Sequence, residues 1–183
     1  MSTGLNRALL VRTADRLRAE LVRDETTGLP IVDELSEADR RELCEVGGGR
    51  IAVVAICLEA RTTPEAELHV VLDGAEPGLV VRAVAQFLGT HVRRTDLVCS
   101  SNAEALLVVA PGLDAIGGRN LAARLHSLLT DGQLEIASMA RELQLRIGFA
   151  CRSQASASGW TVSALGAEAA LHASEPALVT TVA

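Results

Sequence analysis

The sequence predicts an α/β sandwich built on one mixed β-sheet. Along the 183 residues, helical and strand-like apolar patterns follow one another in the order α, α, β, α, β, β, α, β, β, α, β. Residues 93–112, RRTDLVCSSNAEALLVVAPG, are two apolar runs joined by a small polar turn, which is typical of a β-hairpin. Hydrophobic residues make up 49% of the chain and aromatic residues 2%, so one aliphatic core is expected.

The first half of the chain contains two predicted helices and a central strand. Residues 5–23 form an amphipathic helix, which can pack on its own domain or pair with a copy of itself. A turn at 27–30 leads into a second helix, predicted from Pro30 to about Cys44 and ended by the glycines at 47–49. Residues 50–60, RIAVVAICLEA, are apolar throughout, as in a central strand covered on both faces. The apolar stripe of the first helix is Leu10, Ala14, Leu17 and Leu21.

The second half supplies the hairpin and its covering helices. A helix at 79–92 precedes the hairpin and another at 113–130 follows it. The remaining predicted elements are a short strand at 134–138, a strand at 143–152, a helix at 163–173 and a closing strand at 177–182.

Composition excludes several classes of function. The 17 basic residues, all of them arginine, are outnumbered by 23 acidic ones, and a net charge of −6 has the wrong sign for a nucleic-acid-binding protein. The first residues contain no apolar run long enough for a signal peptide, so none is expected, and no apolar stretch approaches the ~20 residues that cross a bilayer. The cysteines lack CxxC spacing and the histidines lack metal-ligand spacing. We therefore expect a reduced, cytoplasmic protein without a metal, a nucleic-acid partner or membrane insertion.

Three stretches of the sequence resemble the GGDEF domains, the diguanylate cyclases that condense two GTP into cyclic di-GMP. DETTGLP, from Asp24, resembles their motif D-x-L-T-G-L-x-N-R. The hairpin resembles R-x-x-D, five residues and G-G-[DE]-E-F, and LQLRIGFA resembles the strand ending S-I-G-V-A. The resemblance implies a three-layer domain over 24–183, with a central mixed, mainly antiparallel sheet flanked by helices. Residues 1–23 would be a dimerisation or signalling helix.

The catalytic motif of this family is degenerate here. Where the family has an acidic metal ligand on its first strand, this chain has Cys57, a poor ligand for magnesium. The lysine and arginine that bind phosphates are replaced by Ser174 and Leu178. With so much of the site changed, we expect no cyclase activity, no catalytic residue and no cofactor. The five motif positions are filled by Asn102, Ala103, Glu104, Ala105 and Leu106, of which only the third keeps a carboxylate.

The R-x-x-D element, by contrast, is complete. In the family it is the inhibitory site that binds the product, and here it is Arg93 and Asp96, with Arg124 where a second family arginine lies. An arginine can donate to guanine O6 and N7, and a carboxylate can accept from guanine N1–H and N2–H. The alternative is a surface ion pair, as expected for Arg12 and Asp15 in the first helix.

These residues predict a catalytically inactive receptor that binds cyclic di-GMP through Arg93, Asp96 and Arg124. Binding would regulate a protein partner or a homodimer. One alternative is an interaction or dimerisation module that binds no nucleotide, in which Arg93 and Arg124 would point apart or pair with acids. Another is GTP binding without turnover, for which Glu104 alone remains.

Overall fold

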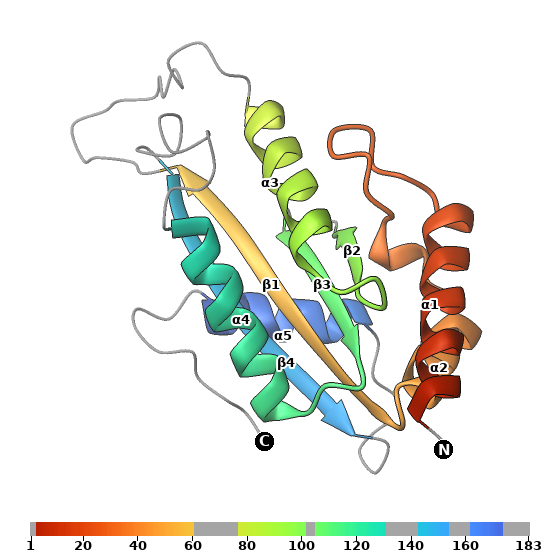
Figure 1. Ribbon diagram of the computed structural model, residues 1–183. Coiled ribbons are helices and arrows are strands. Elements are labelled where there is room, and N and C mark those ends of the chain that lie inside the picture. The colour runs from red at the N-terminus through yellow and green to blue at the C-terminus, as the bar shows by residue number, and fades with distance from the viewer. Residues whose placement is uncertain (1–2, 61–76, 102–104, 131–142, 154–161, 174–183) are drawn as a thin grey trace, which may run out of the picture.

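A computed structural model describes residues 3–60, 77–101, 105–130, 143–153 and 162–173 (Figure 1). The predicted strands at 134–138 and 177–182 lie outside these ranges. In chain order the elements are α1 (Thr3–Glu20), the 3₁₀ helix η1 (Val32–Glu34), α2 (Glu37–Val46), β1 (Arg50–Ala60), α3 (Pro77–His91), β2 (Leu97–Ser100), β3 (Ala105–Pro111), α4 (Ala115–Thr130), β4 (Leu143–Ser153) and α5 (Val162–Ala173).

Four antiparallel strands form the sheet, in the order β2-β3-β1-β4. The apolar strand β1 is central, as predicted, and pairs with β4 along its whole length, from Arg50–Ser153 to Ala60–Leu143. Strands β2 and β3 form the predicted hairpin. Among the described residues, parallel pairing is limited to an isolated bridge between Ile31 and Ser100.

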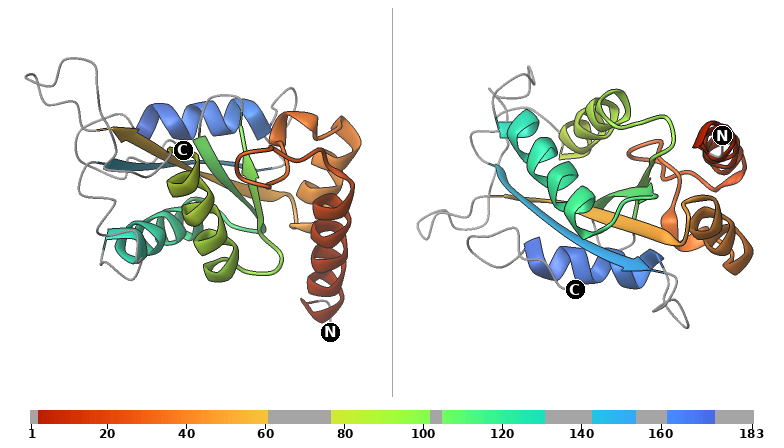
Figure 2. Two further views of the ribbon diagram at one scale, coloured as in Figure 1. Left: turned by 90° about the horizontal axis from the view of Figure 1, so that it is seen from above. Right: turned by 60° about the horizontal axis from the view of Figure 1, so that its bottom comes forward.

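Both faces of the sheet are covered by helices, which confirms the three-layer architecture (Figure 2). Alternate residues of β1 point to opposite faces. Val53 and Ala55 belong to one buried cluster together with side chains of α1, α2 and α5. Val54 and Ile56 belong to a second cluster with side chains of α3 and α4. The R-x-x-D segment joins the C-terminal end of α3 to β2, which is an edge strand of the sheet.

The second helix begins later than predicted. Pro30 does not start it; it forms a bridge with Arg23, and its carbonyl oxygen accepts from the Ser100 backbone N–H at 2.9 Å. Helix α2 begins after Ser36, whose hydroxyl accepts from the Asp39 backbone N–H while the Asp39 carboxylate accepts from the Ser36 N–H, both at 3.2 Å. This capping box satisfies two N–H groups that would otherwise lack partners, so it decides where the helix starts.

Helix α1 packs on its own domain. Ala14 and Leu17 of its predicted stripe are buried, and Leu10 and Leu21 are half-buried. On the adjoining face, Arg16 donates to Asp39 and to Glu42 of α2, each at 2.8 Å. No helix in the described ranges has the length and apolar character needed to cross a membrane.

Candidate functional site

The R-x-x-D segment is a tight turn built around Asp96. The Asp96 N–H donates to the Arg93 carbonyl oxygen at 2.9 Å, closing the turn. Its carboxylate accepts from the Arg93 N–H at 3.0 Å and from the Thr95 hydroxyl at 3.3 Å. The Asp96 side chain therefore holds the backbone that presents Arg93.

Asp96 is buried, with 1% of its surface exposed. Burial raises the pKa of Asp96, because it disfavours the charged form, and the Arg93 N–H bond and the charges of Arg93 and Arg124 act in the opposite direction. The carboxylate does not line the pocket described next. In the structure the Asp96 side chain is bonded to the turn itself, and its contact with a ligand stays a prediction.

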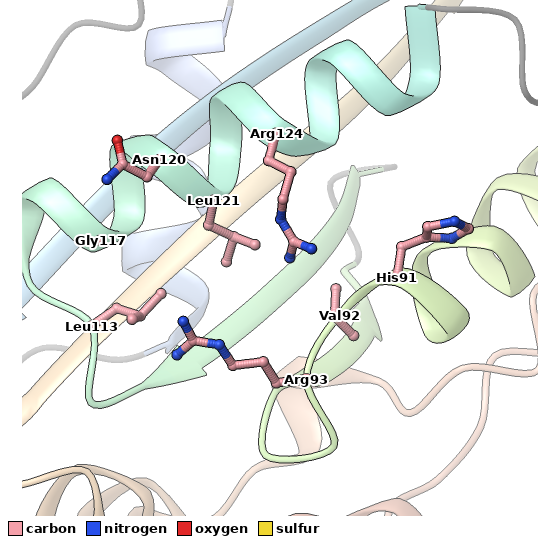
Figure 3. Close-up of a pocket in the computed structure, with 8 residues that line it drawn as sticks. All are labelled: His91, Val92, Arg93, Leu113, Gly117, Asn120, Leu121 and Arg124. Atoms are coloured by element: carbon pink, nitrogen blue, oxygen red, sulfur yellow. The ribbon is translucent and has the colours of Figure 1, made fainter.

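Arg93 and Arg124 converge on one pocket of about 460 Å³ between the α3–β2 loop and α4. Figure 3 shows both side chains directed into the space between the two elements. Neither guanidinium forms an ion pair with a residue of the described ranges. The remaining lining is mostly apolar or small: His91, Val92, Leu113, Gly117, Asn120 and Leu121.

Helix α4 sets the height of Arg124 above the sheet. Gly118 faces β1 and β4, and a Cβ at this position would lie 3.1 Å from Ala52 Cβ and 3.1 Å from Phe149 Cδ2. The absence of a side chain lets the helix come this close. Leu121 and Leu125 are buried against the sheet, which leaves Arg124 exposed beside them.

Helix α1 also contacts the turn, which the sequence did not predict. The Arg18 guanidinium donates to the carbonyl oxygens of Arg94 at 2.7 Å and Asp96 at 2.5 Å. The predicted pair of Arg12 with Asp15 is not formed; Asp15 accepts instead from Arg18 at 2.8 Å and from Arg94 at 2.7 Å. The hydrogen bond from Arg94 is the main cause of the lowered pKa of Asp15. Apart from the bond between Arg18 and Asp15, these bonds link residues 76 to 79 positions apart, so no local pattern indicates them.

The other end of the hairpin holds the degenerate motif positions. Asn102, Ala103 and Glu104 lie outside the described residues. Ala105 and Leu106 are buried, each with 3% exposure, on opposite faces of the sheet.

The family's metal position lies at the same end of the sheet. Cys57 is the strand partner of Ala105, so the structure brings together two of the positions that the family resemblance assigns to acidic residues. A thiol and a methyl group do not fit a magnesium site, which requires oxygen ligands. Within the described residues, no group of three or more His, Cys, Asp or Glu side chains could hold a metal ion.

Comparison with known proteins gives structural matches alone. No family model and no curated protein matches the sequence. The GGDEF domain of DgcB from Caulobacter crescentus, solved with c-di-GMP, matches with a TM-score of 0.55 and 18% identity over 82% of this chain and 84% of that chain.

Two further solved structures agree. The diguanylate cyclase SiaD from Pseudomonas aeruginosa, solved with its activator SiaC, gives a TM-score of 0.59 at 17% identity over 93% of this chain and 62% of that chain. A sensory box/GGDEF family protein from Caulobacter crescentus gives 0.54 at 24% identity over 82% of this chain and 94% of that chain. The chain therefore has the fold of a GGDEF domain.

Proposed function

We propose that this protein is a receptor for cyclic di-GMP that binds the dinucleotide between Arg93 and Arg124 and does not synthesise it. The observation that supports this most is that two guanidinium groups converge on one pocket, and neither forms an ion pair with an acid of the described residues. The alternative, an interaction module without a nucleotide, predicts arginines that point apart or pair with acids. Their arrangement favours the receptor.

The chemistry of the pocket suits a guanine nucleotide. A guanidinium can donate two parallel N–H bonds to guanine O6 and N7 or to a phosphate. Two such groups on opposite walls can hold a ligand that has both guanine bases and phosphates. Apolar surface for a base comes from Val92, Leu113 and Leu121. The volume lies within the range typical of small-molecule sites. One structure of similar fold, DgcB, was solved with c-di-GMP.

Asp96 acts in this proposal as a positioning residue. Its carboxylate is already bonded to the Arg93 N–H and is almost fully buried, so it fixes the direction of Arg93. Its negative charge also acts on both arginines, which reduces the repulsion between two cations that face one pocket.

The pairing of Cys57 with Ala105 supports the absence of synthesis. Phosphoryl transfer depends on metal ions that neutralise developing charge on the phosphates. Neither Cys57 nor Ala105 supplies a carboxylate at this strand end, and Glu59, at the second acidic position of the family's first strand, is two residues further along β1.

The contact with α1 offers a route from the ligand to a partner. Arg18 holds two carbonyl groups of the turn, so a ligand that fixes Arg93 also fixes the C-terminal end of α1. The range of conformations of α1 would then differ between the ligand-bound and the free protein, and a partner that binds α1 could distinguish the two states. SiaD, which has a similar fold, was solved in complex with a protein activator.

Isothermal titration calorimetry with cyclic di-GMP tests the proposal. Wild type is expected to bind, and Arg93→Gln and Arg124→Gln are each expected to weaken binding by about tenfold or more, since each removes a paired contact. Arg41→Gln is the matched control, because Arg41 is exposed on α2 and, among the described residues, pairs only with Glu37, at 3.2 Å. Wild type that is folded and gives no heat would refute the receptor.

A product assay tests the second half of the proposal. Incubation of the wild type with GTP and magnesium should yield no cyclic di-GMP by chromatography. Detectable product would mean that the chain is an enzyme, whatever the calorimetry shows.

A further inference from the structure

A second cavity, of about 400 Å³, lies on the other side of the R-x-x-D turn. It is formed by the end of α1, the turn at 23–30, the C-terminal part of α3 and the start of β2. It shares only Val92 and Arg93 with the pocket of Arg124. Its charged lining is Arg18, Arg23, Arg93, Arg94 and Asp96, and we call it the arginine pocket.

The arginine pocket has an excess of positive charge in a chain of net charge −6. Asp96 is the only acid among the described residues that line it, and it is buried. Asp15 lies outside the lining and pairs with both Arg18 and Arg94. The Arg23 guanidinium donates to the carbonyl oxygens of Gly28 at 2.7 Å and Arg18 at 2.6 Å. Because a carbonyl group has no net charge, these bonds leave the positive charge of Arg23 uncompensated. An anion is the ligand that this imbalance favours.

The arginines also retain hydrogen-bond donors. A guanidinium carries five N–H groups. The bonds to described residues use three of these groups on Arg18 and two on Arg23. Donors that come from separate walls suit a ligand with several oxygens in different directions, such as a phosphate or pyrophosphate, better than a flat carboxylate.

We propose that the arginine pocket binds a small phosphorylated molecule, at a site distinct from the pocket between Arg93 and Arg124. The inference does not depend on the receptor function, because it rests on Arg18, Arg23 and Arg94, which do not line that other pocket.

Gly89 provides a way to close the arginine pocket alone. It lies on α3 and lines this cavity, and it does not line the other pocket. A Cβ built at Gly89 meets nothing within 4 Å. The Cβ of a leucine there therefore displaces no described neighbour, so a bulky side chain can be introduced at the lining of this cavity, and leucine also favours the helix.

The experiment is a calorimetric titration of inorganic pyrophosphate into wild type, Gly89→Leu, Arg23→Gln and Arg124→Gln, each checked for folding by circular dichroism. Wild type and Arg124→Gln should bind pyrophosphate alike. Gly89→Leu and Arg23→Gln should weaken binding by about tenfold or more, by blocking the cavity and by removing a cation. Gly89→Leu also answers the concern that Arg23→Gln disturbs the turn at 23–30.

Two results would overturn the proposal: no pyrophosphate binding by folded wild type, or binding that Arg124→Gln abolishes and Gly89→Leu leaves intact. The same four proteins titrated with cyclic di-GMP separate this outcome from the receptor function. Cyclic di-GMP binding lost in Arg124→Gln and kept in Gly89→Leu upholds the receptor, whatever pyrophosphate does. A second cyclic di-GMP site that only Gly89→Leu and Arg23→Gln remove would identify the dinucleotide as the source of the phosphate.

Discussion

Asp96 lies where few aspartates are found, because burial removes the hydration that an ionised carboxylate needs. It is retained within a turn that uses both of its oxygens, one for the Arg93 N–H and one for the Thr95 hydroxyl. The sequence predicted a residue that touches the ligand. The structure shows that residue buried and bonded within the turn that carries Arg93, and its contact with a ligand stays a prediction.

Substitution of Asp96 separates its hydrogen bonds from its charge. Asp96→Asn keeps an acceptor for the Arg93 N–H, so the free energy of unfolding at pH 7 should be unchanged or higher. Asp96→Ala removes the acceptor and should lower it by about 1 to 3 kcal/mol. Urea denaturation measures both. An alanine variant as stable as the asparagine variant would show that the turn does not depend on this side chain.

The same residue predicts a dependence on pH. Burial raises the pKa of folded Asp96 above the ordinary value of 3.8. The folded state therefore holds the Asp96 proton more tightly than the unfolded state does. The resulting contribution to the free energy of unfolding is fully present below pH 3.8 and is lost as the pH rises through the folded pKa. Any advantage of Asp96→Asn over wild type should shrink as the pH is lowered from 7 toward 4, as followed by urea denaturation at each pH. An advantage that grows on acidification would contradict the assigned direction.

At the scale of elements, two glycines on neighbouring helices have opposite roles. Gly118 of α4 is in close contact with the sheet, whereas a Cβ at Gly89 of α3 meets open space. Gly118→Ala should lower stability by about 1 to 3 kcal/mol through overpacking and should weaken ligand binding, because α4 carries Arg124. Gly89→Ala should raise stability by up to about 1 kcal/mol. Thermal unfolding measures the stability of both variants. Equal changes in stability would mean that α4 does not pack closely on the sheet at Gly118.

The contact between α1 and the turn yields a further prediction. Arg18→Met keeps most of the aliphatic stem and removes the bonds to the carbonyl groups of Arg94 and Asp96. We expect a loss of about 1 to 3 kcal/mol and faster hydrogen exchange in the segment 93–97. Arg12→Met, on an exposed position of the same helix, is the control and should match wild type in both measurements. Unchanged exchange in Arg18→Met would show that α1 and the turn are not coupled.

Element prediction from the sequence succeeded where apolar periodicity was continuous. The strand at 50–60 and the helices that cover it follow directly from that pattern. The start of α2 was wrong because Pro30 is a common first residue of helices, while Ser36 and Asp39 form a capping box only when the backbone between them turns. That Arg93 and Arg124 lie on one site was predicted from the family resemblance, and both line one pocket. The Arg18 contacts could not be found, since they depend on how α1 lies against a distant loop.

At the scale of the whole molecule, a ligand that binds only the folded state stabilises the domain by mass action. At a free cyclic di-GMP concentration one hundred times the Kd, the gain is about 2.7 kcal/mol. Thermal unfolding of wild type should therefore shift upward with added dinucleotide, and Arg124→Gln should shift much less at the same concentration. An equal shift in both proteins would place the ligand elsewhere.

The most direct test of the central claim is a double-mutant cycle over Arg93 and Arg124, measured as the Kd of cyclic di-GMP by calorimetry. Two arginines that hold one ligand should be coupled, so that the double variant loses less binding free energy than the two single variants lose together. That result would assign the ligand to the pocket between the α3–β2 loop and α4. Full-strength binding by either single variant would contradict the account.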